Sequence, residues 1–271
     1  FQVLDKKIYN NEKINEILVE SARVIFKSWF VNFDPVKAKT KKNSIEIVKE
    51  ISDLFPNFFE NTDLGMVPKG WTTTKVGEIL DILGGYAFKS KDYKKNGIFV
   101  LRTKNFDNGY CQNLVDDVFL PEKFLKSHEK FICEEFDYHL VMVGASIGKR
   151  AIIFPSMLPA LRNQNMWCFR PISTNTPKFF TKFLVDIVSK KLANFAGGSA
   201  RDFFRKEDFR NFKIVLPPQK ILDVYKEMTD PLLKKLSKNY EEINLLKDLK
   251  NNLLSKLISG ELKIDQMKEN L

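Results

Sequence analysis

The stretch Leu4-Asp5-Lys6-Lys7-Ile8, close to the start of the chain, returns near its other end as Leu232-Leu233-Lys234-Lys235-Leu236. Asn11 then matches Asn239, and Ile14-Asn15 matches Ile243-Asn244 after a slip of one residue. In both regions apolar residues recur every three or four positions, which is the spacing of an amphipathic helix. An internal repeat of this kind predicts two similar helices, and because they enter and leave the region between them, we expect them to pack antiparallel.

The first helix is expected over residues 4–30. It ends in a dense aromatic run, Ser28-Trp29-Phe30-Val31-Asn32-Phe33, which is typical of a helix end anchored against a neighbour. The second helix is expected from Gln219 to Ser259, where a heptad pattern has Asn239 and Lys250 as polar interruptions. Pro231 is expected to divide this run into a short helix and a long one. The residues expected to pair the helices are Ile8, Ile17, Ile25, Trp29, Leu232, Leu236, Ile243, Leu246, Leu253 and Leu257.

The region between the helices has short apolar runs separated by turn residues, which is typical of strands. Strands are expected at residues 98–101, 138–143, 151–154, 166–169 and 213–216, and a helix at 178–195. The predicted fold class is α+β: one α/β domain rich in short strands, flanked by two long helices that form an antiparallel coiled coil. The expected boundaries are a helix at 1–36, a linker at 37–66, the domain at 67–218, a helix at 219–262 and a tail at 263–271.

The positive charge of the chain is concentrated in the predicted domain. The formal net charge is +10, and residues 67–218 carry 24 basic and 15 acidic residues. The segment before them carries 10 of each, and the segment after them carries 10 basic and 9 acidic residues. A general preference for lysine would raise the flanks as well. A basic excess confined to one domain indicates a surface that binds the phosphate backbone of a nucleic acid.

The sequence does not indicate a metal centre or a membrane segment. Cys111, Cys133 and Cys168 lie far apart, and His128 and His139 form no close pair with them, so a zinc site is not predicted. Buried, reduced thiols in a cytoplasmic protein are expected instead. No apolar run approaches the length of a membrane helix.

Catalytic motifs are not found either. The turn Gly144-Ala145-Ser146-Ile147-Gly148-Lys149 has three residues between its glycines, whereas a nucleotide-binding P-loop has four. Asp116-Asp117 and Glu134-Glu135 have no obvious lysine partner for nuclease chemistry. We therefore expect a protein that is not an enzyme and uses no cofactor.

Polar side chains on turns of the basic domain are the candidates for DNA contact. Arg and Lys can bind guanine edges, and Asn and Gln can bind adenine edges, although most contacts of a DNA-binding protein go to phosphates. The candidates are Lys89, Lys91, Arg102, Lys104, Asn105, Lys149, Arg150, Arg162, Asn163, Gln164, Asn165, Arg201, Arg205 and Lys206. The run from Arg162 to Asn165 is favoured for base contact, although such a run can also satisfy a buried turn.

Several short motifs, in a fixed order, are similar to those of a known family. They are Phe26-Lys27-Ser28-Trp29-Phe30-Val31-Asn32-Phe33-Asp34-Pro35, Pro68-Lys69-Gly70-Trp71, Gly84-Gly85-Tyr86-Ala87-Phe88, the turn at 144–149, Asn163-Gln164-Asn165, Gly197-Gly198-Ser199, Val215-Leu216-Pro217-Pro218-Gln219 and Leu253-Leu254-Ser255-Lys256-Leu257-Ile258-Ser259-Gly260. From Leu4 to Leu262 the chain resembles the specificity subunit of type I restriction-modification enzymes.

The resemblance implies a non-catalytic subunit that reads one half of a bipartite site in double-stranded DNA. It also implies that a methyltransferase subunit docks on the helices and that a restriction subunit, the motor-nuclease, joins through the complex. A full subunit carries two recognition domains and this chain has one, so we expect a C-terminal half or a half-length form, whose two copies could form a homodimer. Two alternatives stay open: the recognition portion of a fused methyltransferase-nuclease, and a coiled-coil assembly protein whose basic domain binds RNA or another partner.

Overall fold

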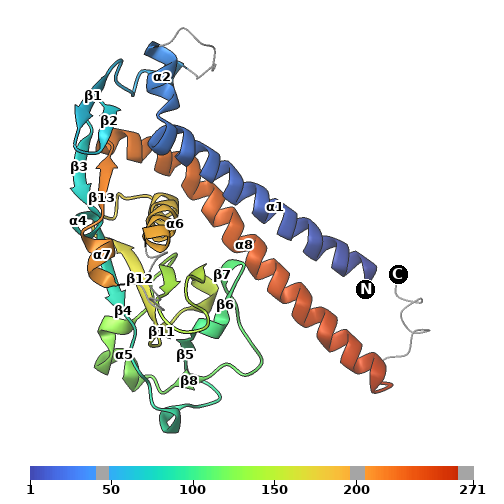
Figure 1. Cartoon of the computed structure of the whole chain (residues 1–271). Coiled ribbons are helices and arrows are strands. Elements are labelled where there is room, and N and C mark those ends of the chain that lie inside the picture. Colours follow the sequence, from blue (N-terminus) through green and yellow to red (C-terminus); the bar gives the residue numbers. More distant parts are fainter. Residues whose placement is uncertain (41–48, 196–204, 262–271) are drawn as a thin grey trace. The chain divides into compact units, whose positions relative to one another are not determined.

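The structure is a computed structural model that describes residues 1–40, 49–195 and 205–261 (Figure 1). The chain divides into two compact units. The helical unit consists of residues 1–22 and the chain from residue 231 onward, and the mixed unit consists of residues 23–230. Each long helix contributes residues to both units.

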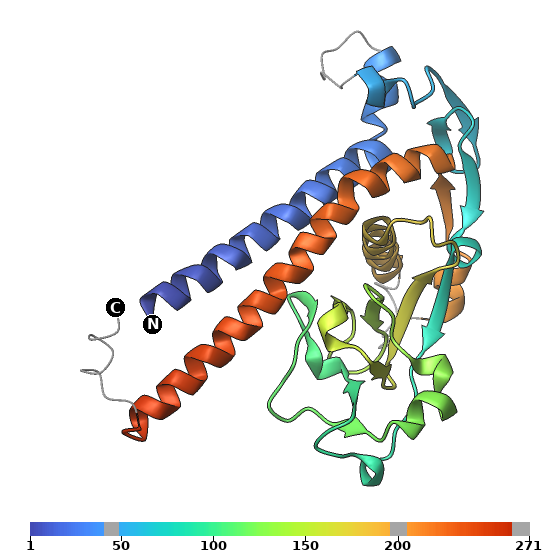
Figure 2. The same ribbon diagram turned by 180° about the vertical axis from the view of Figure 1, so that it is seen from behind.

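The helical unit is an antiparallel pair formed by α1 (Gln2–Phe26) and α8 (Gln219–Ile258). Lys250 binds Asp5 at 2.5 Å, Lys247 binds Glu12 at 3.4 Å, and Asn239 binds Asn15. Residue numbers thus rise on one helix as they fall on the other, and Figures 1 and 2 show the two helices side by side. The predicted antiparallel pairing is confirmed.

Most of the residues predicted to pair the helices are buried or half-buried, with one exception in this unit. Ile8, Leu236 and Ile243 are buried. Leu232, Leu246, Leu253 and Leu257 are half-buried, and so is Ile25 in the mixed unit. Ile17 is wrong: its side chain is 64% exposed. The buried face of α1 repeats through Leu4, Ile8, Asn11, Asn15, Leu18 and Ala22, and Ile17 lies one residue away from it, which turns its side chain by about 100° around the helix.

Three buried asparagines lie inside the helix pair. The side-chain amide of Asn239 donates a hydrogen bond of 2.9 Å to the side-chain oxygen of Asn15. Asn11 is also buried and donates to Glu242 at 2.9 Å. Because a buried amide that loses its partner costs about 1–3 kcal/mol, other alignments of the two helices are disfavoured. The polar pair therefore fixes the register, as asparagines do in coiled coils.

Pro231 does not divide the second helix. It lies inside the continuous α8, so the predicted break is wrong. An internal proline removes one backbone donor and costs about 3 kcal/mol. Tyr225 and Thr229 before the proline and Leu233 and Leu236 after it are all buried, and this packing on both sides offsets the cost.

The mixed unit contains thirteen short strands in the described residues. They are β1 (Phe59–Thr62), β2 (Gly65–Pro68), β3 (Thr72–Lys75), β4 (Leu80–Gly84), β5 (Ile98–Leu101), β6 (Phe106–Asp107), β7 (Gly109–Cys111), β8 (Phe119–Leu120), β9 (Tyr138–Val141), β10 (Arg150–Ile152), β11 (Ala160–Arg162), β12 (Met166–Pro171) and β13 (Lys213–Leu216). Six form a sheet in the order β4-β12-β9-β10-β7-β6, and three form the sheet β11-β5-β8. β1 pairs with β2, and β13 pairs with β3.

Short helices connect these strands. They are the π-helix Lys27–Asn32, α2 (Asp34–Thr40), α3 (Lys49–Ser52), α4 (Val76–Ile79), α5 (Lys123–Ser127), α6 (Lys178–Phe195) and α7 (Lys206–Arg210), with 3₁₀ turns at Ser90–Asp92, Thr103–Asn105, Glu129–Phe131 and Pro155–Met157. The predicted α+β class is confirmed, and the predicted helix 178–195 and strand 213–216 match α6 and β13. The hairpin β1-β2 begins inside the segment expected to be a linker.

Aromatic side chains anchor the end of α1 in the mixed unit. The ring centroid of Phe30 lies 5.1 Å from that of Phe180 on α6 and 5.2 Å from that of Tyr225 on α8. Trp29 lies 5.3 Å from Phe55 and 6.1 Å from Tyr225. Rings at these distances bury large apolar areas and attract each other edge to face. The aromatic run therefore anchors the helix end, as its composition predicts, and Trp29 does face the second long helix.

The three cysteines and one histidine lie in the core of the mixed unit. The cysteines are buried thiols, and burial raises the pKa of each thiol. Asp137, His139 and Cys168 bring ligand atoms within 4.8 Å of one another. However, both carboxylate oxygens of Asp137 accept hydrogen bonds from Arg170, at 3.0 and 2.6 Å. This group is best explained as a hydrogen-bonded core, because its carboxylate is already neutralised by a guanidinium.

Burial of His139 predicts that folding stability depends on pH. Burial lowers the pKa of His139 from 6.5 to about 4, so the folded protein excludes a proton that the unfolded chain takes up. As the pH falls from about 6.5 to 5, the free energy of unfolding should therefore decrease by about 2 kcal/mol. Denaturant titrations of the wild type and of His139→Gln measure this. The variant should lose this decrease, and an equal decrease in both proteins would contradict the assignment.

Candidate nucleic-acid interface

Five strands of the mixed unit begin or end at one edge. β4 ends at Gly84 opposite Trp167 near the start of β12, and β9 ends at Val141 opposite Met166. In the smaller sheet β5 and β11 run parallel and end together at Leu101 and Arg162. The loops that follow, residues 85–88, 102–105, 142–149 and 163–165, therefore lie at one edge, which we call the loop edge. It brings together most of the predicted DNA-contact residues.

Gly85 is required for two of these loops to meet. The backbone of Tyr86 donates to the carbonyl of Arg162 at 3.2 Å, and Tyr86 bridges to Asn163. A Cβ atom on residue 85 would lie 1.7 Å from the carbonyl oxygen of Asn163. Only glycine permits this approach of two backbones. Gly85 thus has a packing role that the sequence motif could not reveal.

Arg162 is a structural residue and not a base reader. Its side chain is 0% exposed. Its guanidinium donates to the carbonyls of Gly84 and Ile132, both at 2.8 Å, and also to the carbonyl of Lys130. Each nitrogen of the guanidinium therefore donates to a backbone carbonyl inside the protein, where a guanine cannot reach it. The prediction that Arg162 contacts a base is wrong, because a buried turn uses the same donors that a base would.

Arg102, Lys104 and Asn105 are bound to an acidic loop. Arg102 donates to the carbonyl of Asp116 at 2.7 Å, and Lys104 forms an ion pair with the side chain of Asp116. Asn105 is buried and donates to Asp117 at 2.7 Å. These three side chains hold the loop that contains Asp116 and Asp117 beside the loop edge, and their charge is compensated there.

Other predicted side chains at the loop edge are exposed. Gln164 and Asn165 project from the loop that joins the two sheets, and Lys149 leaves the glycine turn at 144–148. Lys89 and Lys91 are exposed just beyond the first loop. Asn163 is partly committed, because its side-chain oxygen accepts from the backbone of Gln164 at 2.8 Å.

Three predicted residues lie elsewhere in the chain. Arg205 precedes α7 and Lys206 begins it. α7 packs through buried Phe209, whose ring lies 5.2 Å from that of Phe169 on β12. Arg201 lies outside the described residues.

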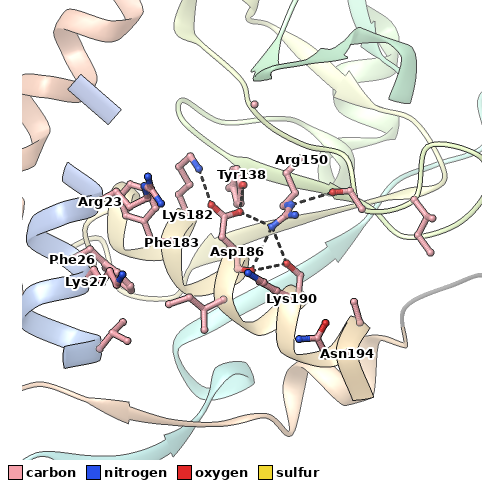
Figure 3. A pocket seen from close by; sticks show the side chains of 17 residues that line it. Arg23, Phe26, Lys27, Tyr138, Arg150, Lys182, Phe183, Asp186, Lys190 and Asn194 are labelled. Atoms are coloured by element: carbon pink, nitrogen blue, oxygen red, sulfur yellow. Dashed lines mark hydrogen bonds and ion pairs between the residues drawn. The ribbon is translucent and has the colours of Figure 1, made fainter. Parts of the chain in front are cut away.

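A half-open cavity of about 1180 Å³ lies beside the glycine turn (Figure 3). Its polar lining includes Arg23 and Lys27, Arg150, and Lys182, Asp186 and Lys190 of α6, and its apolar lining includes Phe26, Val31, Ile147 and Phe183. We call it the cationic cavity, because among the described residues five basic side chains line it and Asp186 is its one acidic side chain. Except for Arg150, none of these basic residues was predicted to bind DNA. The spacing of four residues from Lys182 to Asp186 to Lys190 was a signal for them, since it places all three on one face of a helix.

Asp186 organises the wall of this cavity. It accepts from Tyr138 at 2.5 Å and from Arg150 at 3.0 Å, and Lys182 binds its second oxygen at 2.8 Å. Burial, together with Asp186, raises the pKa of Tyr138 well above its usual value, so the hydroxyl stays a donor. Arg150 also donates to the hydroxyl of Ser189 at 3.1 Å. Arg150 therefore fastens β10 to α6, in addition to its position beside the glycine turn.

Comparison with known proteins identifies the family. A sequence model described as the type I restriction modification DNA specificity domain matches residues 68–262. The chain belongs to this family. The match includes all four loops of the loop edge and all of α6, so the interface described above is part of a specificity domain.

Relatives of the specificity domain are specificity subunits. The type I restriction enzyme MjaIX specificity subunit of Methanocaldococcus jannaschii is 28% identical over 266 residues, which are 97% of this chain and 57% of that subunit. The MjaVIII specificity subunit of the same organism is 25% identical over 284 residues, with 97% and 65% covered. The chain thus spans 57–65% of the length of these curated relatives.

A solved structure shares the fold. The crystal structure of the type I restriction-modification system S subunit from M. genitalium matches with a TM-score of 0.56 at 14% identity. The match covers 94% of this chain and 58% of that one. Two long helices and a strand-rich specificity domain are therefore an arrangement that this chain has in common with a known specificity subunit.

Replacement of Arg162 should destabilise the specificity domain. Arg162→Ala removes the side-chain donor to the carbonyls of Gly84 and Lys130, while the carbonyl of Ile132 keeps Arg170 as a donor. The free energy of unfolding should therefore fall by at least about 2 kcal/mol. Arg205→Ala, at an exposed arginine, should change it by less than about 0.5 kcal/mol. Chemical denaturation of the three proteins measures both effects. A stable Arg162→Ala variant in which only DNA binding is abolished would restore the role that the structure rejects.

Proposed function

We propose that this chain is the DNA-reading part of a type I restriction-modification complex and has no catalytic role. Its specificity domain would read one half of a bipartite site in double-stranded DNA. The observation that carries this proposal is the loop edge, where Gln164 and Asn165 are exposed among loops that Arg162 and Gly85 hold in place. Fixed amide side chains suit adenine edges, which present one donor and one acceptor in the major groove.

The helical unit supports a second part of the proposal, the docking of a methyltransferase subunit. Ile17 is 64% exposed, and Leu245 and Ile258 on α8 are 70% and 79% exposed. Val3, Ile14 and Leu249 are exposed on the same helix pair. Apolar side chains that gather on an exposed surface mark an interaction site. We propose that helices of the methyltransferase cover them, and that the restriction subunit joins through that complex.

The alternative functions that the sequence leaves open have less support. The named relatives are specificity subunits, which favours this proposal over a fused methyltransferase-nuclease or an RNA-binding assembly protein. Two copies of the chain could also pair and present two loop edges, and sedimentation of the purified chain would detect such a homodimer.

Among the described residues no helix has the length and apolar character to cross a membrane. We expect the complex to act in the cytoplasm, where its DNA lies.

Methylation mapping tests the proposal directly. The chain is co-expressed with the methyltransferase subunit encoded beside it, and modified adenines are mapped along a genome. The wild type should direct modification to one defined site. Gln164→Ala or Asn165→Ala should relax the preference at single positions of the site, by about 1–3 kcal/mol for each bidentate hydrogen-bonded pair that the substitution removes.

Asn96→Ala is the matched control, because Asn96 is an exposed asparagine in a turn outside the loop edge. It should leave the modified sites unchanged. If modification of adenines does not depend on the chain at all, the proposed function is refuted. If it depends on the chain but neither Gln164→Ala nor Asn165→Ala changes the preferred site, the loop edge is not the base-reading surface.

A further inference from the structure

We propose that the cationic cavity binds phosphate groups of the DNA whose bases the loop edge reads. This inference rests on the proposed function and assigns a separate role to a separate set of residues. The cavity and the loop edge share the glycine turn at 144–149. Ile147 and Gly148 of the glycine turn line the cavity, while Met142, at the base of the same turn, donates its backbone N–H to the carbonyl of Asn165 at 3.2 Å.

Most basic side chains in the loops of the loop edge are paired or buried, and Lys149 is the exposed exception. Arg102 pairs with Asp117 at 3.4 Å, and Lys104 pairs with Asp116. Arg162 is buried. Affinity for DNA comes largely from lysines and arginines that neutralise phosphates and release counterions. With Lys149 as the one exposed and unpaired cation in these loops among the described residues, further cations close to the loop edge would add to the affinity for DNA.

The cationic cavity supplies such charges. Asp186 is shared by Arg150 and Lys182, so this one carboxylate balances at most one of them. Lys27 and Lys190 also line the cavity, and neither has an ion-pair partner among the described residues. Both lysine side chains are exposed. An incoming phosphate could pair with them without breaking any ion pair of the wall, which keeps the cost of binding low.

The form of the cavity favours a polymer over a small molecule. Pockets for small ligands usually enclose most of the ligand surface, whereas this cavity is half-open and has basic groups from α1, the π-helix, β10 and α6 along its walls. A DNA strand that crosses the cavity continues at both ends and keeps one side in solvent. Its charges are closely spaced, so several of them can meet the row of basic groups at once.

A double substitution tests the assignment. Lys27→Gln/Lys190→Gln removes the two unpaired charges, and Lys69→Gln/Lys220→Gln removes two exposed lysines elsewhere in the mixed unit. Binding to a duplex of unrelated sequence and to the mapped site is measured over a range of salt concentrations. The first variant should bind both duplexes more weakly by the same factor. Its plot of log K against log salt should be shallower by about 2, since each phosphate contact contributes about 0.9 to the slope. The control should match the wild type.

Two further measurements separate contact from indirect effects. Lys27→Arg/Lys190→Arg keeps the charge and should keep the affinity. In a lysine-acetylation footprint, DNA should protect Lys27 and Lys190 and leave Lys69 and Lys220 reactive.

If the wild type binds DNA and the first variant binds with equal affinity and slope, the inference is overturned while the proposed function stands. If the wild type binds no DNA, alone or with the methyltransferase, both fail. An unchanged affinity for DNA together with a weakened affinity for the methyltransferase would overturn the inference and assign the cavity to an acidic segment of that partner.

Discussion

The guanidinium of Arg162 is the interaction on which the loop edge depends. It lies in the core and donates to carbonyls of two backbone segments, at Gly84 and at Lys130 and Ile132. Those segments belong to different sheets and loops, so one side chain sets the distance between them. A buried cation is tolerated only when its donors are satisfied, and three carbonyls satisfy this one. The exposed residues that follow, Gln164 and Asn165, therefore stand on a fixed backbone.

Charged side chains of the specificity domain have different roles near the loops and in the cavity. Near the loops, acids neutralise arginine and lysine and so hold loops in place, as with Arg102 and Asp117. In the cationic cavity Asp186 joins β9, β10 and α6 by binding Tyr138, Arg150 and Lys182. The helical unit uses neutral amides for the same purpose, since Asn15 and Asn239 fix the register of α1 and α8. In each case a polar contact sets the geometry, while the surrounding apolar packing supplies most of the stability.

The regular parts of the fold could be predicted because local spacing determines them. Repeats of three and four residues placed both long helices, and the run from Lys178 to Phe195 matched α6. The break at Pro231 was predicted wrongly because tertiary packing overrides the local cost of a proline inside a helix. Ile17 was assigned wrongly because a shift of one position turns a side chain by about 100° around the helix. The hairpin β1-β2 was missed because its residues, including Asn61 and Thr62, have little apolar alternation.

The candidate site was less predictable, for a physical reason. A side chain such as Arg162 has the same donors whether they face three carbonyls or a guanine, and only burial distinguishes the two. The cationic cavity joins Lys27, Arg150 and Lys190, which are far apart in sequence and meet only after folding. By contrast, the basic excess of residues 67–218 falls on the segment that carries all of the loop edge, and it includes Arg150, Lys182 and Lys190 of the cavity. Net charge indicates such a segment because it does not depend on which side chains meet.

Hydrogen exchange of the backbone amides, with and without duplex DNA carrying the mapped site, is the sharpest test of the loop edge as the DNA-reading surface. We predict slower exchange in residues 85–88, 142–149 and 163–165 when DNA is bound, and no change in the hairpin β1-β2. Unchanged exchange at all three loops, with protection confined to another surface of the mixed unit, would contradict this role.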